Sequence, residues 1–235
     1  MTTLCKFLKK SYRNSQIKHF YTSMVESGLA RIEIEENCNP FHLFGEWLDE
    51  SKACGKFNTV FFNLATTNRN GDVSNRVVVL RDFKENSLVF VTNGNSKKIQ
   101  QIKANPKVSA CFFWNYTKDE KYIQRQVRIE GISVEMSFQE CLEYYNKEPL
   151  YCKIRSHICQ QGQKVDWDTL KKKHDEILEE IKTTNKQLPM PEYLVAYKII
   201  PNKFDFYFAW DNNIADRLEF IQKSGNGWEF YHVAA

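Results

Sequence analysis

The strongest constraint on the fold is a series of β-rich segments joined by short polar turns. Residues 60–67 and 74–83 are separated by Asn68-Arg69-Asn70-Gly71-Asp72, a composition typical of a hairpin turn. Two longer β-rich segments, 107–116 and 122–134, follow each other in the same way. Consecutive hairpins build an antiparallel sheet, whereas a parallel sheet needs strands that alternate with helices. We therefore predict a mainly antiparallel α+β fold, a closed or nearly closed β-barrel with flanking helices.

Capping residues, the helix-ending Asn105-Pro106 and apolar residues at helical spacing predict four helices. Asn39-Pro40 supplies a cap and a first helical residue, and Ser137 with Glu140 forms a capping box. Ser96 precedes a third helix, which Asn105-Pro106 ends. The expected helices cover residues 40–53, 97–104, 138–147 and 167–185. The remaining strands are expected over residues 87–92, 193–200, 204–210, 218–222 and 228–232.

The composition indicates one globular domain preceded by a basic segment. Of the 235 residues, 42% are hydrophobic, 9 are Gly and 6 are Pro, which excludes collagen-like and low-complexity chains. Neither a change of composition nor a repeat divides residues 26–235, so a single domain is expected there. Residues 1–25 contain basic but no acidic side chains and are expected to form a poorly ordered terminus. A mitochondrial presequence is the alternative for this segment.

Charge and cysteine usage limit the partners and the compartment. The net charge of +4 is too small to indicate nucleic-acid binding. The longest apolar stretches fall far short of the roughly 20 residues that span a bilayer. The 7 cysteines include no CxxC pair, which favours reduced thiols and an intracellular, cytoplasmic protein. The 5 histidines lack the spacing of metal ligands, so no metal is expected.

Residues 92–98, with the sequence Thr-Asn-Gly-Asn-Ser-Lys-Lys, form the best candidate anion site. A predicted strand ends there, a turn with Gly94 follows, and the next helix starts with free N–H groups that can hold a phosphate. Lys97 and Lys98 in the first helical turn oppose the helix dipole unless an anion compensates them. A helix start with two solvated lysines is the alternative, and spacing alone leaves both open.

Six groups of residues, in one order along the chain, indicate a known family. They cover residues 76–81, 90–98, 105–106, 125–131, 189–191 and 216–217. Together they resemble the pyridoxamine 5'-phosphate oxidase family, FMN enzymes that make pyridoxal 5'-phosphate. The resemblance extends from about Asn39 to the C-terminus and implies an FMN-binding split β-barrel. It also implies a homodimer that holds FMN at the subunit interface.

For the cofactor, the resemblance implies a set of residues that match the family's residue types or replace them conservatively. These are Arg76, Val77, Val78, Val79, Thr92, Ser96, Lys97, Lys98, Gln126, Gln161, Tyr207 and Arg217. Arg76 and the lysines are suited to neutralise the FMN phosphate, whereas Gln126 and Arg217 are suited to the polar edge of the isoalloxazine ring. Lys97 stands where the family usually has Arg, and Tyr207 where it has Trp.

The substrate side departs further from the family pattern. The resemblance places substrate contacts at Arg81, Tyr144, Glu148, Cys152, Asn213 and Ala215. The family binds the B6 phosphate with a Lys, a Tyr, an Arg and a Ser, so Glu148 puts an anion in place of a cation. Asn213 and Ala215 replace the Arg and the His of an Arg-x-His motif that covers the substrate ring. Lys9 and Tyr12 match two N-terminal residues that close over the substrate in the family.

Two interpretations follow from this asymmetry between cofactor side and substrate side. In the first, the chain is an FMN flavoprotein that oxidises pyridoxine and pyridoxamine 5'-phosphates weakly or not at all. In the second, it is a functional B6 vitamer phosphate oxidase, with O2 as the acceptor, in which Lys153 or Arg155 replaces the lost phosphate clamp. The change to Glu148 favours the first, because a carboxylate repels a phosphate.

Overall fold

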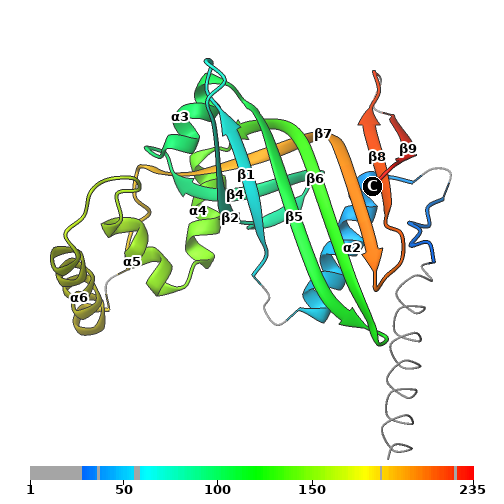
Figure 1. Ribbon diagram of the computed structural model, residues 1–235. Helices are drawn as coiled ribbons and strands as arrows, with labels where there is room; N and C mark the ends of the chain where they lie inside the picture. The colour runs from blue at the N-terminus through cyan, green and yellow to red at the C-terminus, as the bar shows by residue number, and fades with distance from the viewer. Residues whose placement is uncertain (1–27, 36–37, 56–58, 186, 225–226) are drawn as a thin grey trace, which may run out of the picture.

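The computed structural model describes residues 28–35, 38–55, 59–185, 187–224 and 227–235. Its central feature is a curved antiparallel sheet with helices around it (Figure 1). Seven of the described strands follow the order β2-β1-β5-β6-β7-β4-β3, and β8 and β9 continue the sheet from β7. The predicted α+β split barrel is confirmed. The basic segment 1–25, with Lys9 and Tyr12, lies outside the described residues, and the single domain over 26–235 stays a prediction.

The observed elements follow the sequence expectations closely at most of their ends. The strands are β1 (Phe61–Thr67), β2 (Val73–Val79), β3 (Asp82–Lys84), β4 (Ser87–Asn93), β5 (Lys107–Lys118), β6 (Lys121–Glu135), β7 (Leu194–Trp210), β8 (Asp216–Gln222) and β9 (Trp228–Val233). The helices are α2 (Pro40–Cys54), α3 (Lys97–Ala104), α4 (Phe138–Lys147), α5 (Leu150–Ile158) and α6 (Trp167–Thr184). All four predicted helices are present, and α5 is an additional one.

Local capping interactions explain where two of these helices begin. Asn39 Oδ1 accepts a hydrogen bond from Phe41 N (2.9 Å), and Pro40 takes the first helical position of α2. The predicted capping box of α4 is formed, because Ser137 Oγ accepts from Glu140 N (3.3 Å) and Glu140 Oε2 accepts from Ser137 N (2.8 Å). These starts are therefore encoded within a few residues of the sequence.

The last long strand differs from the sequence expectation. Residues 193–200 and 204–210, expected as two strands, form the single strand β7, because pairing with β6 continues past Pro201. Gly131 lies opposite Pro201 at a register shift, and a Cβ on Gly131 would lie 2.3 Å from Ile200 O. The missing side chain lets β7 approach and bend without leaving β6. One strand consequently pairs with β4 at its start and with β8 at its end.

The segment 74–83, expected as one strand, is broken into β2 and β3 at Leu80 and Arg81. Leu80 N donates to Val60 O (2.9 Å), whereas Arg81 N donates to Val89 O on β4 (2.8 Å). The backbone thus leaves one end of the sheet and joins the other at this point. The break brings the two ends of the sheet together and helps to close the barrel.

Helix α2 fills the barrel with aromatic side chains. Phe44 packs edge-on against Phe112 on β5, with ring centroids 5.1 Å apart, and Trp47 packs edge-on against Phe206 on β7 at 5.2 Å. All four side chains are buried. Burying each ring stabilises the fold by about 1.5–3 kcal/mol, so α2 is firmly anchored to the sheet.

A second, smaller cluster packs α4 against the start of β7 and includes Cys141, Tyr145 and Ala196. Helix α5 continues from α4, and Tyr193 fixes it by donating a hydrogen bond to Ser156 O (2.8 Å). Helix α6 has no buried residue and projects from the rest of the molecule (Figure 1). None of the described helices is long and apolar enough to cross a membrane.

Candidate functional site

Lys98 is a buried lysine in the first turn of α3, with only 5% of its surface exposed. Its Nζ donates hydrogen bonds to Thr92 Oγ1 (2.8 Å), Ser96 Oγ (3.1 Å) and Gln161 Oε1 (2.8 Å). These partners come from the end of β4, the N-cap of α3 and the turn after α5. The fold thus brings four of the predicted cofactor residues together, and we call them, with Arg76, the Lys98 cluster.

Arg76, on β2, adds a second cation to this cluster. Its guanidinium donates to Leu64 O and to Thr66 Oγ1, both at 2.8 Å. Burial, together with the nearby Arg76 charge, lowers the pKa of Lys98 to about 8, and burial also lowers the pKa of Arg76. Among the described residues no carboxylate pairs with either side chain. Two partly buried cations that repel each other are suited to bind a multiply charged anion such as a phosphate.

The start of α3 supports the same conclusion. Ser96 occupies the N-cap, but its hydroxyl makes no capping bond and instead accepts from Lys98. The first turn of α3 carries no acidic side chain, so its N–H groups and the positive end of the helix dipole lack compensation. Of the two interpretations left open by the sequence, solvated lysines fit Lys97, which is exposed, but do not fit Lys98.

Thr66 and Gln101, neither of which was predicted from the sequence, hold Arg76 in place. Thr66 Oγ1 donates to Gln101 Oε1 (2.6 Å), and Gln101 Nε2 donates to Asp72 O (3.0 Å). Both side chains are buried. Thr66 has the same inward orientation on β1 as Leu64, so a polar residue at an inward position was the available signal.

A second group of predicted cofactor residues lies in a row across three strands. Gln126 on β6 pairs with Tyr207 on β7, and Tyr207 pairs with Arg217 on β8. Side chains of directly paired residues lie on the same face of a sheet. Arg217 is held by Asp205, with Nε–Oδ1 at 2.9 Å and the second nitrogen to Oδ2 at 2.6 Å. We call Gln126, Tyr207 and Arg217 the strand row.

Strand β4, which carries Thr92 of the Lys98 cluster, pairs with the start of β7, whereas β8, which carries Arg217 of the strand row, pairs with its end; Figure 1 shows β4 and β8 at different ends of β7. Thr92 pairs with Val195, and Tyr207 comes twelve residues later (207 − 195 = 12). At about 3.3 Å per residue this corresponds to about 40 Å along the curved strand. One copy of the chain therefore places the two groups of predicted cofactor residues far apart along the sheet.

The face that carries the strand row also carries exposed apolar side chains. Phe113 pairs with Gln126 and is 56% exposed, and Phe61 and Val77 are 52% and 61% exposed. Of the predicted cofactor residues on β2, Val77 points outward, whereas Val78 packs against the core. Val79 pairs with Phe61. Large exposed apolar side chains that gather on one sheet face indicate a protein contact surface.

A cavity of about 380 Å³ adjoins the Lys98 cluster and shares Thr92 and Gln161 with it. Its wall is built from the end of β4, the end of α4, helix α5 and the start of β7. Three of the predicted substrate residues, Arg81, Glu148 and Cys152, line this cavity. The structure thus places the predicted substrate side directly beside the predicted phosphate end of the cofactor side.

Arg81 and Glu148 form an ion pair inside this cavity, with Nη2 and Oε1 2.6 Å apart. The side chains are 29% and 9% exposed, respectively. The other carboxylate oxygen, Glu148 Oε2, is buried and has no hydrogen-bond donor among the described residues. An unsatisfied buried acceptor costs about 1–3 kcal/mol. The pair neutralises Arg81, which is therefore not available as an uncompensated cation in the way that Arg76 and Lys98 are.

Arg155, which the sequence offered only as a replacement for the lost phosphate clamp, lines the cavity. Its guanidinium donates to Cys152 Sγ (3.0 Å), and its carbon Cζ lies 5.1 Å from the centre of the Tyr151 ring. No carboxylate within the described ranges forms an ion pair with it. Lys153, the other suggested substitute, donates instead to Asn146 O (3.1 Å) and does not line the cavity.

Three predicted substrate residues lie outside this cavity. The Tyr144 hydroxyl donates to Asp82 Oδ2 (3.1 Å). Asn213 and Ala215 lie in the turn between β7 and β8, next to the strand row, and Asn213 Nδ2 donates to Trp210 O (3.0 Å). Within one chain, Asn213 and Ala215 therefore do not line the cavity that contains Arg81, Glu148 and Cys152.

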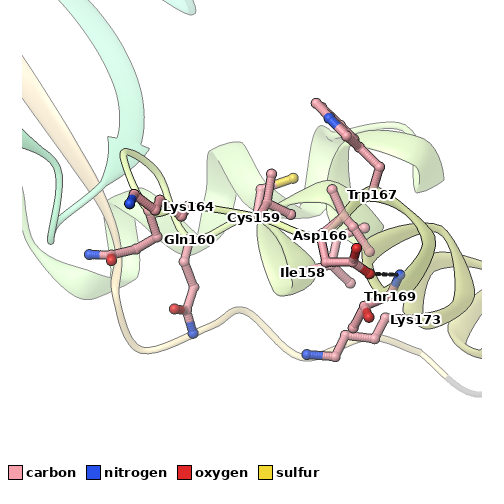
Figure 2. A pocket seen from close by; sticks show the side chains of 11 residues that line it. Ile158, Cys159, Gln160, Lys164, Asp166, Trp167, Thr169 and Lys173 are labelled. Atoms are coloured by element: carbon pink, nitrogen blue, oxygen red, sulfur yellow. Dashed lines mark hydrogen bonds between the residues drawn. The ribbon is translucent and has the colours of Figure 1, made fainter.

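A further cavity of about 370 Å³ lies between the end of α5 and the start of α6 (Figure 2). Its acidic side chain, Asp166, is engaged in capping α6, where Oδ1 accepts from Thr169 N (2.8 Å). Trp167, at its rim, is 73% exposed. In the described part of the chain, no group of His, Cys, Asp and Glu side chains is arranged to hold a metal ion.

Two solved structures share the architecture of this chain. PhzG from Burkholderia lata, in complex with tetrahydrophenazine-1-carboxylic acid, aligns with a TM-score of 0.75 at 21% identity, over 88% of this chain and 100% of that one. A pyridoxamine 5'-phosphate oxidase-related, FMN binding protein from Nostoc punctiforme aligns with a TM-score of 0.64 at 15% identity, over 84% and 98% of the two chains. At these identities the similarity shows the fold.

Two relatives found by sequence are more similar in sequence to this chain than these two structures are. The chain is 30% identical over 197 residues to a pyridoxine/pyridoxamine 5'-phosphate oxidase from Bordetella pertussis, covering 84% of this chain and 90% of that one. It is 31% identical over 199 residues to the protein of the same name from Pelagibacter ubique, covering 82% and 90%. Residues 52–183 match the sequence profile of the family described as pyridoxamine 5'-phosphate oxidase. The chain belongs to the pyridoxamine 5'-phosphate oxidase family.

Proposed function

We propose that the chain is a flavoprotein that binds FMN and holds the FMN phosphate in the Lys98 cluster. The observation that carries this proposal is the presence of two partly buried cations, Arg76 and Lys98, without an acidic partner in the described structure. Thr92, Ser96 and Gln161 fix the ammonium of Lys98, so both cations are in place before the anion arrives. Bound FMN supplies a two-electron acceptor that dioxygen can reoxidise.

We propose further that the functional unit is a homodimer. The strand row lies on a face with exposed apolar side chains. Measured along β7, about 40 Å separate Tyr207 in this row from Val195, which pairs with Thr92 of the Lys98 cluster. Docking of a second copy through this face buries Phe61 and Phe113 and brings one subunit's strand row towards the other's Lys98 cluster. Gln126 and Arg217 would then meet the polar edge of the flavin ring, as the family resemblance implies.

The charges of the cavity bear on whether this protein oxidises B6 phosphates efficiently. A phosphate ester that enters the cavity meets the carboxylate of Glu148, and Arg81 is already neutralised by it. We therefore propose weak or absent oxidation of pyridoxine and pyridoxamine 5'-phosphates. Arg155 supports the second candidate, a functional oxidase with a substituted clamp, because it lines the cavity and has no acidic partner among the described residues.

The direct test is the visible spectrum of the purified protein, followed by calorimetry with added FMN. We expect flavin absorbance and a single FMN site per subunit. A colourless protein that gives no heat of binding with FMN would contradict the proposal. Oxygen uptake with the two B6 phosphates then separates the candidates, since turnover on the order of 1 per second or faster is ordinary for an enzyme and would favour the functional oxidase.

The dimer is tested by light scattering of the FMN-loaded protein. We expect twice the mass of the 27.8 kDa chain. Phe113→Glu places a charge in the proposed interface and should shift the mass to that of one chain, whereas Phe138→Glu, at an exposed phenylalanine on α4, serves as the matched control. A monomer with FMN bound would contradict the contribution of Arg217 from the partner subunit.

A further inference from the structure

We propose that the cavity beside the Lys98 cluster binds a small molecule that presents an N–H or O–H donor, rather than a phosphate, to Glu148. This inference rests on the proposed function, because it concerns the molecule that would lie next to the bound cofactor. The ligand class is a ring compound with an amine or a hydroxyl group where B6 phosphate esters carry the phosphate.

The first observation is the charge balance of the cavity wall. Arg81 and Glu148 neutralise each other at 2.6 Å, which leaves Arg155 as the only charged lining residue without an ion-pair partner within the described ranges. Arg155 is also exposed and donates to Cys152 Sγ. A phosphate dianion placed here faces a buried carboxylate and gains at most one exposed cation. A neutral or cationic group avoids this repulsion.

The second observation is the incomplete hydrogen bonding of Glu148. Its side chain is 9% exposed, Oε1 is engaged with Arg81, and Oε2 is buried without a donor among the described residues. The terminal torsion of a glutamate is soft, and we infer that rotation about it presents Oε2 to the cavity that the side chain lines. A donor on a bound molecule would then satisfy the remaining acceptor with a charge-assisted hydrogen bond. A phosphate offers no such donor in its dianionic form.

The third observation is the position of the cavity. It shares Thr92 and Gln161 with the Lys98 cluster, and both of these residues hold the ammonium of Lys98. A molecule of the size of one substituted aromatic ring fits within about 380 Å³. The donor-bearing ligand would therefore lie beside the cofactor, where a substrate has to lie, and not at a remote surface site.

The test compares two probes that differ at one position. Pyridoxamine carries a hydroxyl group where pyridoxamine 5'-phosphate carries the phosphate ester. The FMN-loaded protein is titrated with each probe, and binding is followed by the change in flavin absorbance and by calorimetry. We expect pyridoxamine to bind at least tenfold more tightly than its phosphate ester. Equal or tighter binding of the ester, or binding of neither probe, would overturn the inference.

Variants of Glu148 and Glu143 test whether the preference for pyridoxamine over its phosphate ester arises in the cavity. Glu148→Gln should weaken pyridoxamine binding at least tenfold and reduce the discrimination against the ester. Glu143→Gln makes the same change at an exposed position of α4 and should leave both affinities unchanged. Calorimetry of the cofactor-free protein with FMN distinguishes the two failures: absent FMN binding contradicts the proposed function, whereas normal FMN binding with a preference for the ester contradicts only this inference.

Discussion

The Lys98 cluster contains Arg76 and the adjoining cavity contains Arg81, but of these two arginines only Arg81 is paired with a carboxylate in the described part of the chain. In the cluster, Arg76 and Lys98 lie close together, and within the described chain neither has an acidic partner. In the cavity, Arg81 is paired with Glu148 at 2.6 Å. A cation without a counter-charge keeps its affinity for an external anion, whereas a paired cation has largely lost it. The two neighbouring regions are therefore suited to different ligands, a phosphate in one and a hydrogen-bond donor in the other.

The largest expected effect comes from restoring the phosphate-binding chemistry of the cavity. The variant combines Glu148→Arg, Cys152→Ser, Asn213→Arg and Ala215→His, because residues that act as a unit are not additive when changed singly. Oxygen consumption with pyridoxamine 5'-phosphate should rise by about a hundredfold or more, the range associated with regaining one well-placed charged or hydrogen-bonding group. The same variant should bind FMN as the natural chain does.

If the unaltered protein already oxidises the ester at a rate ordinary for enzymes, the pairing of Arg81 with Glu148 does not exclude the phosphate from the cavity. In that case Arg155→Ala should abolish the activity, because Arg155 is the cavity cation without an acidic partner in the described structure. The matched control is Lys153→Ala, which lies on the same helix but outside the cavity wall.

The next largest effect concerns the cofactor side. Arg76→Ala should weaken FMN binding by about 1.5–3 kcal/mol, or roughly 10- to 150-fold, because it removes a hydrogen-bonded charge from the cluster. Calorimetric titration with FMN measures this change. Arg69→Ala, at an exposed arginine in the β1–β2 turn, should leave the affinity unchanged. Equal losses in both variants would indicate a general charge effect and not a built site.

The smallest effect is a dependence of FMN affinity on pH. Lys98 has a pKa lowered to about 8 by burial and by Arg76, and a bound phosphate would raise it again. Above pH 8 the free protein must take up a proton to bind FMN, so the affinity should fall by about tenfold between pH 7 and pH 9. Lys98→Arg keeps its charge over this range and should flatten the profile. A flat profile in the natural chain would contradict the role of Lys98.

Short-range signals made most of the fold predictable from the sequence. The caps of α2 and α4 and the turn between β1 and β2 lie within a few residues of the elements that they define. The continuous strand β7 was not predictable in this way. Its continuity depends on Gly131, which lies opposite Pro201 but seventy residues earlier in the chain (201 − 131 = 70). Contacts of this kind leave no local pattern in the sequence.

The candidate site was predictable to a similar extent. The turn before α3 made an anion site one of two interpretations of the sequence, and the family resemblance supplied Arg76 and Gln161. The pairing of Arg81 with Glu148 was not predictable, because it forms only when the segment between β2 and β3 packs beside the end of α4. The support of Arg76 by Thr66 and Gln101 was also missed, since it requires β1 and α3 to be in contact. Side-chain pairing between distant segments was the information that only the structure provided.

The close approach of Arg76 and Lys98 has a consequence for the amount of folded protein in a cell. Their mutual repulsion and burial make the cofactor-free chain less stable than it would be with a neutral pair. A ligand that binds only the folded chain stabilises it by about 2.7 kcal/mol when its concentration is a hundred times the dissociation constant. If FMN is that ligand, as proposed above, the cofactor-free chain should unfold more often than the FMN-loaded chain and should be the form that proteases remove first.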